Sequence, residues 1–552
     1  MSDDSSDDEN FYERYFGRDD LDDLDDDSEM NHFRKPLREV TDVDVDVFGL
    51  DIQAIDWSQL PWTRTEFRNT RIQGFQNYRN VELDPVQEAL FQQSARSPLS
   101  RTPAAFYHFQ HTRLRDHPAI SHFQLRNLVC ATSKNDVFFA SPTTVRHITP
   151  HTQHASRPVI DLTESGRTAF RISTMCAANV VGVGVAIAGG FSGEFALRRW
   201  SGGGGIEDQG SVGNGDHCGD LEEDEWSMDA GESGTPPKRR KTVRDATKDR
   251  SATPEDSQIT TGYFNRDVNG IINSITVDQS RSGAPTAYVS SNDNAARLVD
   301  LHALKVVSRL QLPWCVNYTA RDPVTGLVCV VGDAQEAWVV DEGGKVVSLL
   351  RGHVDFSFAC AWNPTGTLLA TGNQDRTARI YDTRILPPTT STESTPTVAT
   401  LGTRMGAVRS LRFSSDGRVL AVAEPADFVQ VWECGGRWRG QEIDFFGEIA
   451  GISFAPDASS LFIGNSDNTY GGILEFSRTP LSLNSDHSLF VRGERTLLPL
   501  DGDFGVTGTK ERTNSAGSWG ESPPMGSSAG VDAMAVGRGP SRARPYWYVK
   551  GA

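Results

Sequence analysis

The residues best suited to chemistry in this sequence are four histidines, because imidazole serves both as a general base and as a metal ligand. They are His108, His111, His117 and His122. We find no acid or cysteine beside them at the spacing of a zinc site, and the chain has no GxSxG, HExxH or Walker motif. We therefore predict no metal, no cofactor and no enzymatic activity.

A second distinctive segment is residues 55–81, IDWSQLPWTRTEFRNTRIQGFQNYRNV, where arginines and aromatic residues intermingle. At about 100° per residue, a helix would collect both kinds of side chain on one stripe. That stripe consists of Arg64, Phe67, Arg68, Arg71, Phe75 and Tyr78. We expect it to clasp the flank of the folded domain, or else to bind a partner peptide or nucleic acid.

A short basic cluster follows later, at Lys238, Arg239, Arg240 and Lys241. In an exposed segment this composition predicts recognition by a nuclear import receptor, although a chance basic run is the alternative. A cluster this short attracts nucleic acid only weakly, so nucleic-acid binding is not expected. The predicted location is the nucleus, the cytoplasm or both.

The clearest structural signal is residues 352–384, GHVDFSFACAWNPTGTLLATGNQDRTARIYDTR. FACAW, LLATGN and ARIYD predict three strands, and NPTG and QDRT predict the turns between them. The segment therefore predicts one antiparallel blade.

This unit resembles a repeat of the WD40 family, because Gly352-His353 opens it and Tyr381-Asp382 stands where Trp-Asp usually closes it. The resemblance implies a hydrogen-bonded tetrad that satisfies buried polar groups and has a structural rather than catalytic role. Its members would be His353, Thr371, Asp375 and Tyr381.

Weaker copies of the unit flank it at a regular period. They end in Val299-Asp300, Val340-Asp341 and Trp432-Glu433, and the polar insert at residues 386–397 lengthens the last interval. With further copies on both sides, we predict an all-β, seven-bladed WD40-type β-propeller between about residues 120 and 478. Residues 104–111 or residues 488–498 would supply the outer strand that closes the ring.

Composition divides the rest of the chain. The net charge of -19 is concentrated at the N-terminus, since residues 1–29 hold fourteen acids and two arginines. Such a tail keeps a protein soluble or attracts basic partner proteins. The predicted parts are an acidic disordered tail (1–50), a helical or extended arginine-aromatic block (51–103), the first blades (104–200), a disordered insert with the basic cluster (201–260), the remaining blades (261–499) and a mostly disordered tail (500–552).

Seven cysteines without a CxxC pair indicate a reducing compartment, and no secretory signal or membrane span is predicted. The arginine-aromatic block is also similar to one in little-studied WD40 proteins of fungi, plants and algae. Thr70-Arg71, Phe75 and Asn77 to Asn80 carry that similarity. It implies no particular activity.

The end of the clearest blade, ARIYDTR, resembles the motif by which many WD40 proteins bind the adaptor of cullin-four RING ubiquitin ligases. The implied adaptor contacts are Asp382 and Arg384. Our main expectation is a non-enzymatic scaffold that binds peptide segments of other proteins on a propeller face. A ligase substrate receptor is the alternative, and an enzyme using the central channel is a more remote one.

Overall fold

The computed structural model describes residues 38–85, 88, 105–152, 154–163, 169–201, 218–220, 259–267, 269–280, 282–436 and 438–480. Strands dominate this part of the chain, and its two α-helices are α2 (Asp42–Phe48) and α3 (Arg64–Gly74). The predicted all-β class is confirmed. The predicted insert and C-terminal tail, with the basic cluster, fall almost entirely outside the described residues.

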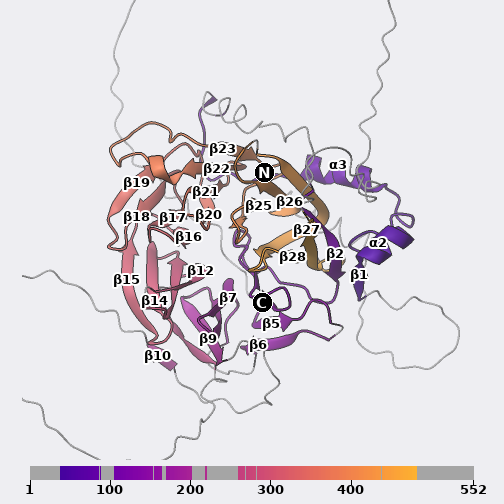
Figure 1. Ribbon diagram of the computed structural model, residues 1–552, viewed down its shortest axis with the longest axis horizontal. Helices are drawn as coiled ribbons and strands as arrows, with labels where there is room; N and C mark the ends of the chain where they lie inside the picture. The colour runs from indigo at the N-terminus through magenta and orange to yellow at the C-terminus, as the bar shows by residue number, and fades with distance from the viewer. Residues whose placement is uncertain are drawn as a thin grey trace, which may run out of the picture. The chain divides into compact units, whose positions relative to one another are not determined.

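Antiparallel sheets stand around a common axis as the blades of a propeller (Figure 1). Blade one is β3 (Val129–Ala131), β4 (Val137–Ala140), β5 (Thr144–Ile148) and β6 (Arg157–Asp161). Blade two is β7 (Thr174–Val180), β8 (Val183–Gly189), β9 (Glu194–Ser201) and β11 (Thr260–Tyr263), which the short β10 (Cys218–Asp220) joins in parallel. Blade three is β12 (Ile272–Gln279), β13 (Pro285–Ser291), β14 (Ala295–Asp300) and β15 (Lys305–Gln311).

The following blades continue the same antiparallel order. Blade four is β16 (Val316–Arg321), β17 (Val328–Gly332), β18 (Ala337–Val340) and β19 (Val346–Leu350). Blade five is β20 (Ser357–Trp362), β21 (Leu368–Asn373), β22 (Thr377–Asp382) and β23 (Ala399–Gly402), with the 3₁₀ turn η2 (Thr383–Ile385) after its third strand. This is the blade that the sequence predicted most clearly.

Blades six and seven share one long strand. Blade six is β24 (Ser410–Phe413), β25 (Val419–Ala423), β26 (Ala426–Glu433) and the first half of β27 (Gly440–Phe454). The second half of β27 pairs instead with β28 (Ser460–Asn465) and opens blade seven. Gly447 allows the change of direction, because its φ of 115° is open to glycine and strained for other residues. The predicted count of seven blades is therefore confirmed.

The ring is closed by a strand from the N-terminal side of the propeller. β2 (Tyr107–Arg113) pairs with β29 (Gly472–Arg478), the last strand of blade seven. This confirms the first of the two closing segments suggested by the sequence, and the other, residues 488–498, lies outside the described residues. The outer edge of β2 is itself paired over three residues with β1 (Glu39–Thr41), so that no long unpaired strand edge remains where the ring closes.

The predicted acidic tail extended to residue 50, but the structure differs after residue 38. Val40 of β1 is completely buried, and a capping box between Thr41 and Asp44 starts α2. The alternating aspartates of residues 42–46 suggest a solvated tail when the segment is considered alone. The segment is ordered because β1 pairs with the edge of β2, which lies far from it in the sequence.

Seven apolar clusters hold the ring together, one between each neighbouring pair of blades. The cluster between blades seven and one joins Phe462 and Ile473 to Val137 and Phe139. Apolar packing is thus continuous around the circle. Each interface contributes hydrophobic stabilisation in proportion to the apolar area it removes from water.

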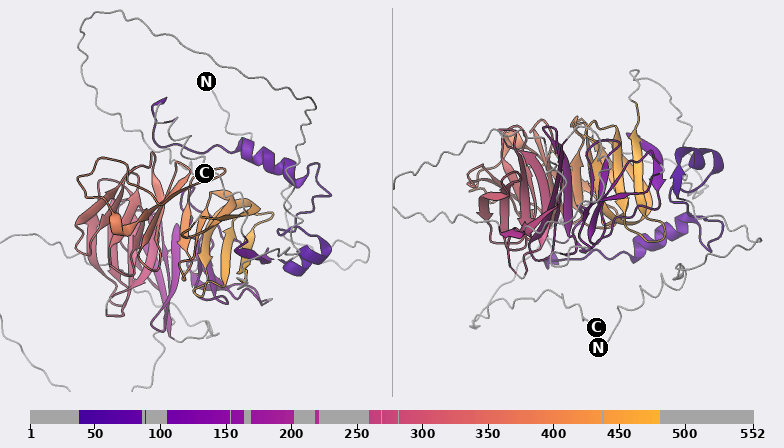
Figure 2. Two further views of the ribbon diagram at one scale, coloured as in Figure 1. Left: turned by 45° about the horizontal axis from the view of Figure 1, so that its top comes forward. Right: turned by 90° about the horizontal axis from the view of Figure 1, so that it is seen from below.

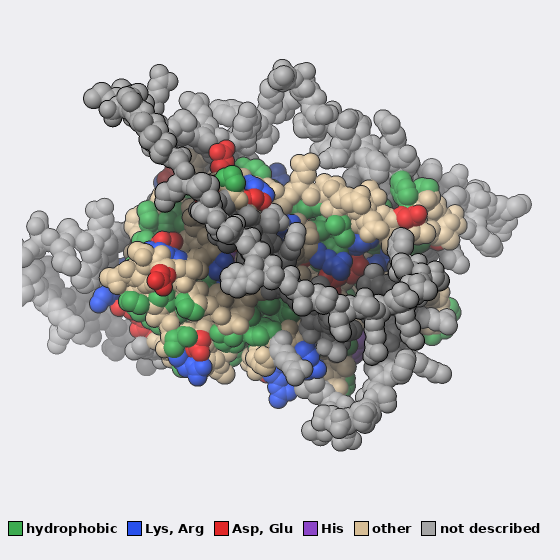
Figure 3. Space-filling model, turned by 90° about the horizontal axis from the view of Figure 1, so that it is seen from above, with side chains coloured by type: hydrophobic (Ala, Val, Ile, Leu, Met, Phe, Trp, Pro, Cys, Tyr) green, Lys and Arg blue, Asp and Glu red, His purple; other side chains and the backbone are tan. Residues whose placement is uncertain are grey.

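On the side of the molecule shown in Figure 3, basic side chains lie beside acidic ones instead of gathering into one basic patch. Among the described residues, no helix combines the length and the apolar character needed to cross a membrane.

Candidate binding face at the mouth of the central channel

The loop between β21 and β22 presents one end of blade five and is fixed by a buried polar network. His353 Nδ1 lies 2.8 Å from Asp375 Oδ2, and His353 Nε2 lies 2.8 Å from Thr371 Oγ1. Asp375 also accepts from the backbone N–H and the hydroxyl of Thr377. Burial acts to raise the pKa of Asp375, but His353 and Thr377 outweigh it, so that the pKa is lowered.

Tyr381, the fourth predicted member of this tetrad, is buried close to Thr371. Its ring is buried among the apolar residues between blades four and five, and its hydroxyl makes no hydrogen bond within the described residues. Burial raises the pKa of Tyr381 to about 12, while Thr371 acts in the opposite direction. Hydrogen bonds within the distance and angle limits link His353, Thr371 and Asp375, and Tyr381 contributes a buried ring close to Thr371.

The arginine-aromatic block forms what we call the strap, residues 51–85, which lies along one face of the ring (Figure 2). α3 begins at a capping box between Thr63 and Glu66. Phe67 then packs against Phe446 of β27, with ring centroids 5.1 Å apart, and Trp57 covers the same ring. The helix is thereby anchored where β27 passes from blade six to blade seven.

Three arginines on the inner face of α3 meet two aspartates of the ring. Arg68 and Arg71 both donate to Asp427 Oδ2 at 2.6 Å, and Asp427 is completely buried. Arg68 also donates to Asp444, and Arg64 donates to both carboxylate oxygens of Asp444 at 3.2 Å. At Arg64, Arg68 and Arg71, the predicted stripe therefore binds the chain's own propeller.

The last two residues of the predicted stripe lie beyond α3, where the helical periodicity no longer applies. Phe75 is half-buried near Gly406, and Tyr78 is 60% exposed with its ring edge toward Phe123. The helical stripe predicted from Arg64 to Tyr78 therefore holds only as far as Gly74. Phe75 already has an extended backbone and ends the helix.

The rest of the strap crosses to blade five. Asn77 donates to the backbone oxygen of Gln374 at 2.9 Å and accepts from the backbone N–H of Ala407. Asn80 donates to Asp355 at 2.9 Å. A pocket of about 230 Å³ lies between this part of the strap and blade five, lined by Asn77, Arg79, Val81, Leu83, Val354, Asp355, Gln374, Asp375 and Arg376.

The same face holds two buried arginines close to the channel axis. Arg126 and Arg409 come just before the innermost strands of blades one and six, and they are 4% and 6% exposed. Nε and Nη1 of Arg409 are buried and make no hydrogen bond within the described residues. Its guanidinium stacks on Phe358, 4.2 Å from the ring centroid.

Arg126 is better satisfied, because it donates to the backbone oxygen of His122 and lies 3.8 Å from Glu448. Burial lowers the pKa of Arg409 to about 9, and repulsion from Arg126 adds to that shift. Burial also lowers the pKa of His122 to about 4, again with help from both arginines. His122 is consequently neutral at physiological pH, and the positive charge of this site belongs to the arginines.

Sequence reasoning did not identify Arg126 or Arg409. The available signal was positional, since Arg409 directly precedes β24, Arg126 lies three residues before β3, and each follows an apolar residue. Many residues occupy such positions, so the position alone does not single out these two arginines. They stand out only in the folded ring, where blades six and one bring them close together. In the described part of the chain, these arginines are the strongest candidates for binding a negatively charged group.

The predicted adaptor contacts lie on the opposite face. Asp382 pairs with Leu368 at the far end of blade five from Gln374, and Arg384 follows in η2 with its side chain 73% exposed. Arg384 forms a two-point ion pair with Asp382, at 2.9 and 2.6 Å. This face is free of the strap contacts described above.

Comparison with known proteins identifies the repeat. The family model described as "WD domain, G-beta repeat" matches residues 344–382. The chain is 38% identical over 93 residues to the F-box-like/WD repeat-containing protein TBL1Y of Homo sapiens and equally to TBL1X of Mus musculus. It is 35% identical over 101 residues to TBL1X of Macaca fascicularis. These matches cover 15–17% of this chain and 17% of each relative.

Proposed function

We propose that this chain, which belongs to the WD40-repeat superfamily, is a non-enzymatic scaffold that binds an acidic segment of a partner protein at the channel mouth. The WD repeats and the similarity to WD repeat-containing proteins support the scaffold role. The charge of the channel mouth supports the acidic partner.

The observation that carries this proposal is that Nε and Nη1 of Arg409 are buried and make no hydrogen bond within the described residues. Removing a charge from water costs several kcal/mol unless a counter-charge compensates for it. Asp355 attracts Arg409 through space, yet no carboxylate among the described residues lies within ion-pair distance of it. A carboxylate on a partner would supply the missing acceptor in a site where water competes poorly.

The chain's own acidic N-terminus, residues 1–29, would compete for the same site. It lies outside the described residues, and its fourteen acids have the required chemistry. If this tail competes, its removal should strengthen the binding of an acidic peptide added in solution.

Replacing Arg409 with methionine should weaken acidic-peptide binding at least tenfold and leave thermal stability unchanged or higher. Methionine keeps the apolar contact with Phe358 while removing a buried charge to which the described residues offer no ion-pair partner. A charge-assisted hydrogen bond contributes about 1.5–3 kcal/mol, which corresponds to at least about tenfold in affinity. The measurement is fluorescence anisotropy with a labelled peptide containing three consecutive glutamates, together with thermal unfolding of both proteins.

Two comparisons make the experiment specific. The same peptide with glutamines in place of glutamates should not bind, and Arg384→Met on the opposite face should bind as the wild type does. The proposal fails if both peptides bind equally, or if folded Arg409→Met retains wild-type affinity. Deletion of residues 1–29 then shows whether the competitor is the chain's own tail.

We also propose, as a second candidate function, that the opposite face binds the adaptor of a cullin-four ubiquitin ligase. The exposure of Arg384 on the face without the strap favours this, since adaptor and acidic partner would then bind at the same time. Arg384→Ala should abolish recovery of the adaptor in affinity purification from cells at equal expression. If the adaptor is absent with the wild type as well, this second function is excluded.

The roles of the basic cluster and the acidic tail rest on sequence alone. We propose that Lys238, Arg239, Arg240 and Lys241 direct nuclear import, and that the acidic tail attracts basic proteins. A fluorescent fusion with these four residues changed to alanine should lose nuclear accumulation. Unchanged accumulation would exclude the signal.

A further inference from the structure

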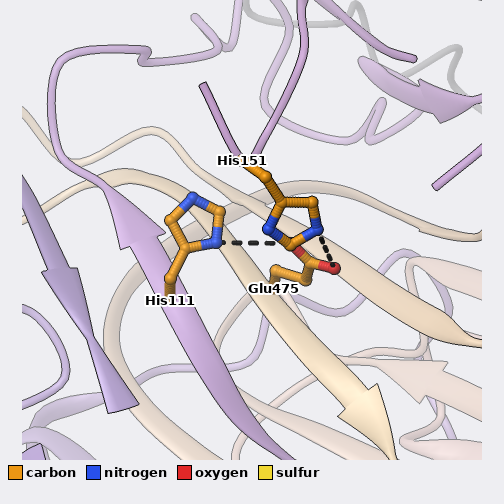
Figure 4. Close-up of side chains that lie close together, drawn as sticks. All are labelled: His111, His151 and Glu475. Atoms are coloured by element: carbon orange, nitrogen blue, oxygen red, sulfur yellow. Dashed lines mark ion pairs between the residues drawn. The ribbon is translucent and has the colours of Figure 1, made fainter. Parts of the chain in front are cut away.

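Three side chains from separate parts of the chain converge where the ring closes (Figure 4). His111 lies on β2, the closing strand, and Glu475 lies opposite it on β29. His151 comes from the loop after β5 of blade one. The site therefore joins the closing strand, the last blade and the first blade.

The inner part of this site contains polar atoms without hydrogen-bond partners. His111 and Glu475 are 7% and 1% exposed. Neither ring nitrogen of His111 makes a hydrogen bond within the described residues, and neither does Glu475 Oε2. Oε1 of Glu475 accepts from the hydroxyl of Ser460 at 2.8 Å, which holds the carboxylate in position. Buried groups of this kind are normally satisfied, so their arrangement points to a missing ligand.

Each imidazole lies near a different oxygen of the Glu475 carboxylate, and the three groups present donor atoms to one another. His111 Nδ1 lies 3.3 Å from Glu475 Oε2, and His151 Nε2 lies 3.6 Å from Glu475 Oε1. One donor atom from each residue lies within 4.8 Å of the others. Zinc bonds of about 2.0–2.2 Å at tetrahedral angles place neighbouring donor atoms roughly 3.3–3.5 Å apart. Two imidazoles and one carboxylate are also ligands that zinc accepts.

We propose that His111, His151 and Glu475 bind one Zn²⁺ ion that fastens the closure of the ring. His151 is 49% exposed, so the ion can enter from solvent and a water molecule can take the fourth position. The metal would add a further link to a closure that also rests on the β2 and β29 pairing, on hydrogen bonds from Arg113 to the backbone of Pro150 and His154, and on the apolar cluster between blades seven and one. Its main effect is therefore on the stability of the closed ring.

The other histidines of the N-terminal group do not join this site. His108 is exposed, His117 lies 3.1 Å from the backbone oxygen of Asp467, and His122 lies beside the channel arginines. The expectation of no metal site depended on the search for an acid nearby in sequence. Glu475 stands at the other end of the propeller, and His151 belongs to a different blade.

The test is zinc titration of the full-length protein after treatment with a chelator. Zinc bound per chain is measured by mass spectrometry of the metal, and thermal unfolding is recorded with and without zinc. The wild type should bind one equivalent that His151→Ala lacks, and zinc should raise only the wild-type unfolding midpoint. Because His151 is half exposed, this substitution leaves the buried groups in place and the protein folded.

Two further variants separate this site from incidental binding to histidine. Glu475→Gln should weaken zinc binding at least tenfold, because it removes the negative ligand. His302→Ala, which removes an exposed histidine elsewhere on the ring, should behave as the wild type. The proposal is overturned if His151→Ala binds as much zinc as the wild type. It is equally overturned if the wild type binds no zinc, which would leave an ordinary histidine and glutamate ion pair.

Discussion

Replacing Asp427 with asparagine is expected to lower the free energy of unfolding by about 3–5 kcal/mol and to release the strap from the ring. The carboxylate is completely buried and accepts from Arg68, from Arg71 and from the backbone N–H of Gly447. Asparagine has the same shape and tolerates the positive φ of 70° found here. It lacks the negative charge, so the buried positive charge of Arg68 is then balanced by Asp444 alone.

The two consequences are measured separately. Chemical denaturation reports the free energy of unfolding, and hydrogen exchange of residues 64–74 reports whether α3 still rests on the ring. Faster exchange in the helix is expected even under conditions where the blades stay protected, because α3 gains its stability from this docking.

A matched control exists on the surface of blade six. Arg439 and Glu433 also form a two-point ion pair, at 2.7 and 3.0 Å, but both side chains are substantially exposed. Glu433→Gln should therefore change the free energy of unfolding by less than about 1 kcal/mol. Equal effects of the two substitutions would show that the burial of Asp427 is unimportant.

Replacing Asp375 with asparagine is expected to cost about 3 kcal/mol of folding free energy at neutral pH. Asp375 is buried and accepts from His353, from the backbone of Val354 and from Thr377. Asparagine removes the charge from this network and turns a donor toward the imidazole or the threonine. The midpoint of chemical denaturation at pH 7 measures the loss.

The pH dependence of this effect has a definite sign. The pKa of Asp375 is lowered from 3.8 in the folded protein, so the folded state binds a proton less readily than the unfolded chain. Its contribution is fully present above about pH 4 and is lost as the pH falls through the lower, folded value. The difference in stability between wild type and Asp375→Asn should therefore shrink under acid conditions.

Asp457 of blade seven provides the control for this second prediction. It accepts from the backbone N–H and the hydroxyl of Ser459, as Asp375 accepts from those of Thr377, but it is exposed and has no histidine partner among its hydrogen bonds. Asp457→Asn should change stability by less than about 1 kcal/mol. A similar loss at both positions would assign the effect to the turn rather than to the buried histidine pair.

The blades could be predicted from the amino-acid sequence alone. Strand, turn and strand follow one another within about 40 residues, so their hydrogen-bond partners are local and a repeated pattern identifies them. The resemblance to a WD40 repeat implied the roles of His353, Thr371 and Asp375, and the register of one blade brings these residues together. The sequence also indicated that the ring must close, but it left residues 104–111 and residues 488–498 as two candidates for the closing strand.

Only the tertiary structure decided which distant groups meet. Arg68 meets Asp427 because the strap lies against blade six, whereas Arg409 meets Arg126 and Glu475 meets His111 because the ring brings the two ends of the propeller together. None of these pairs has a characteristic spacing, since the contacts depend on the closing of the circle and not on local periodicity. Burial then gives these charged groups their energetic importance, and it exists only once the strap and β2 lie against the blades.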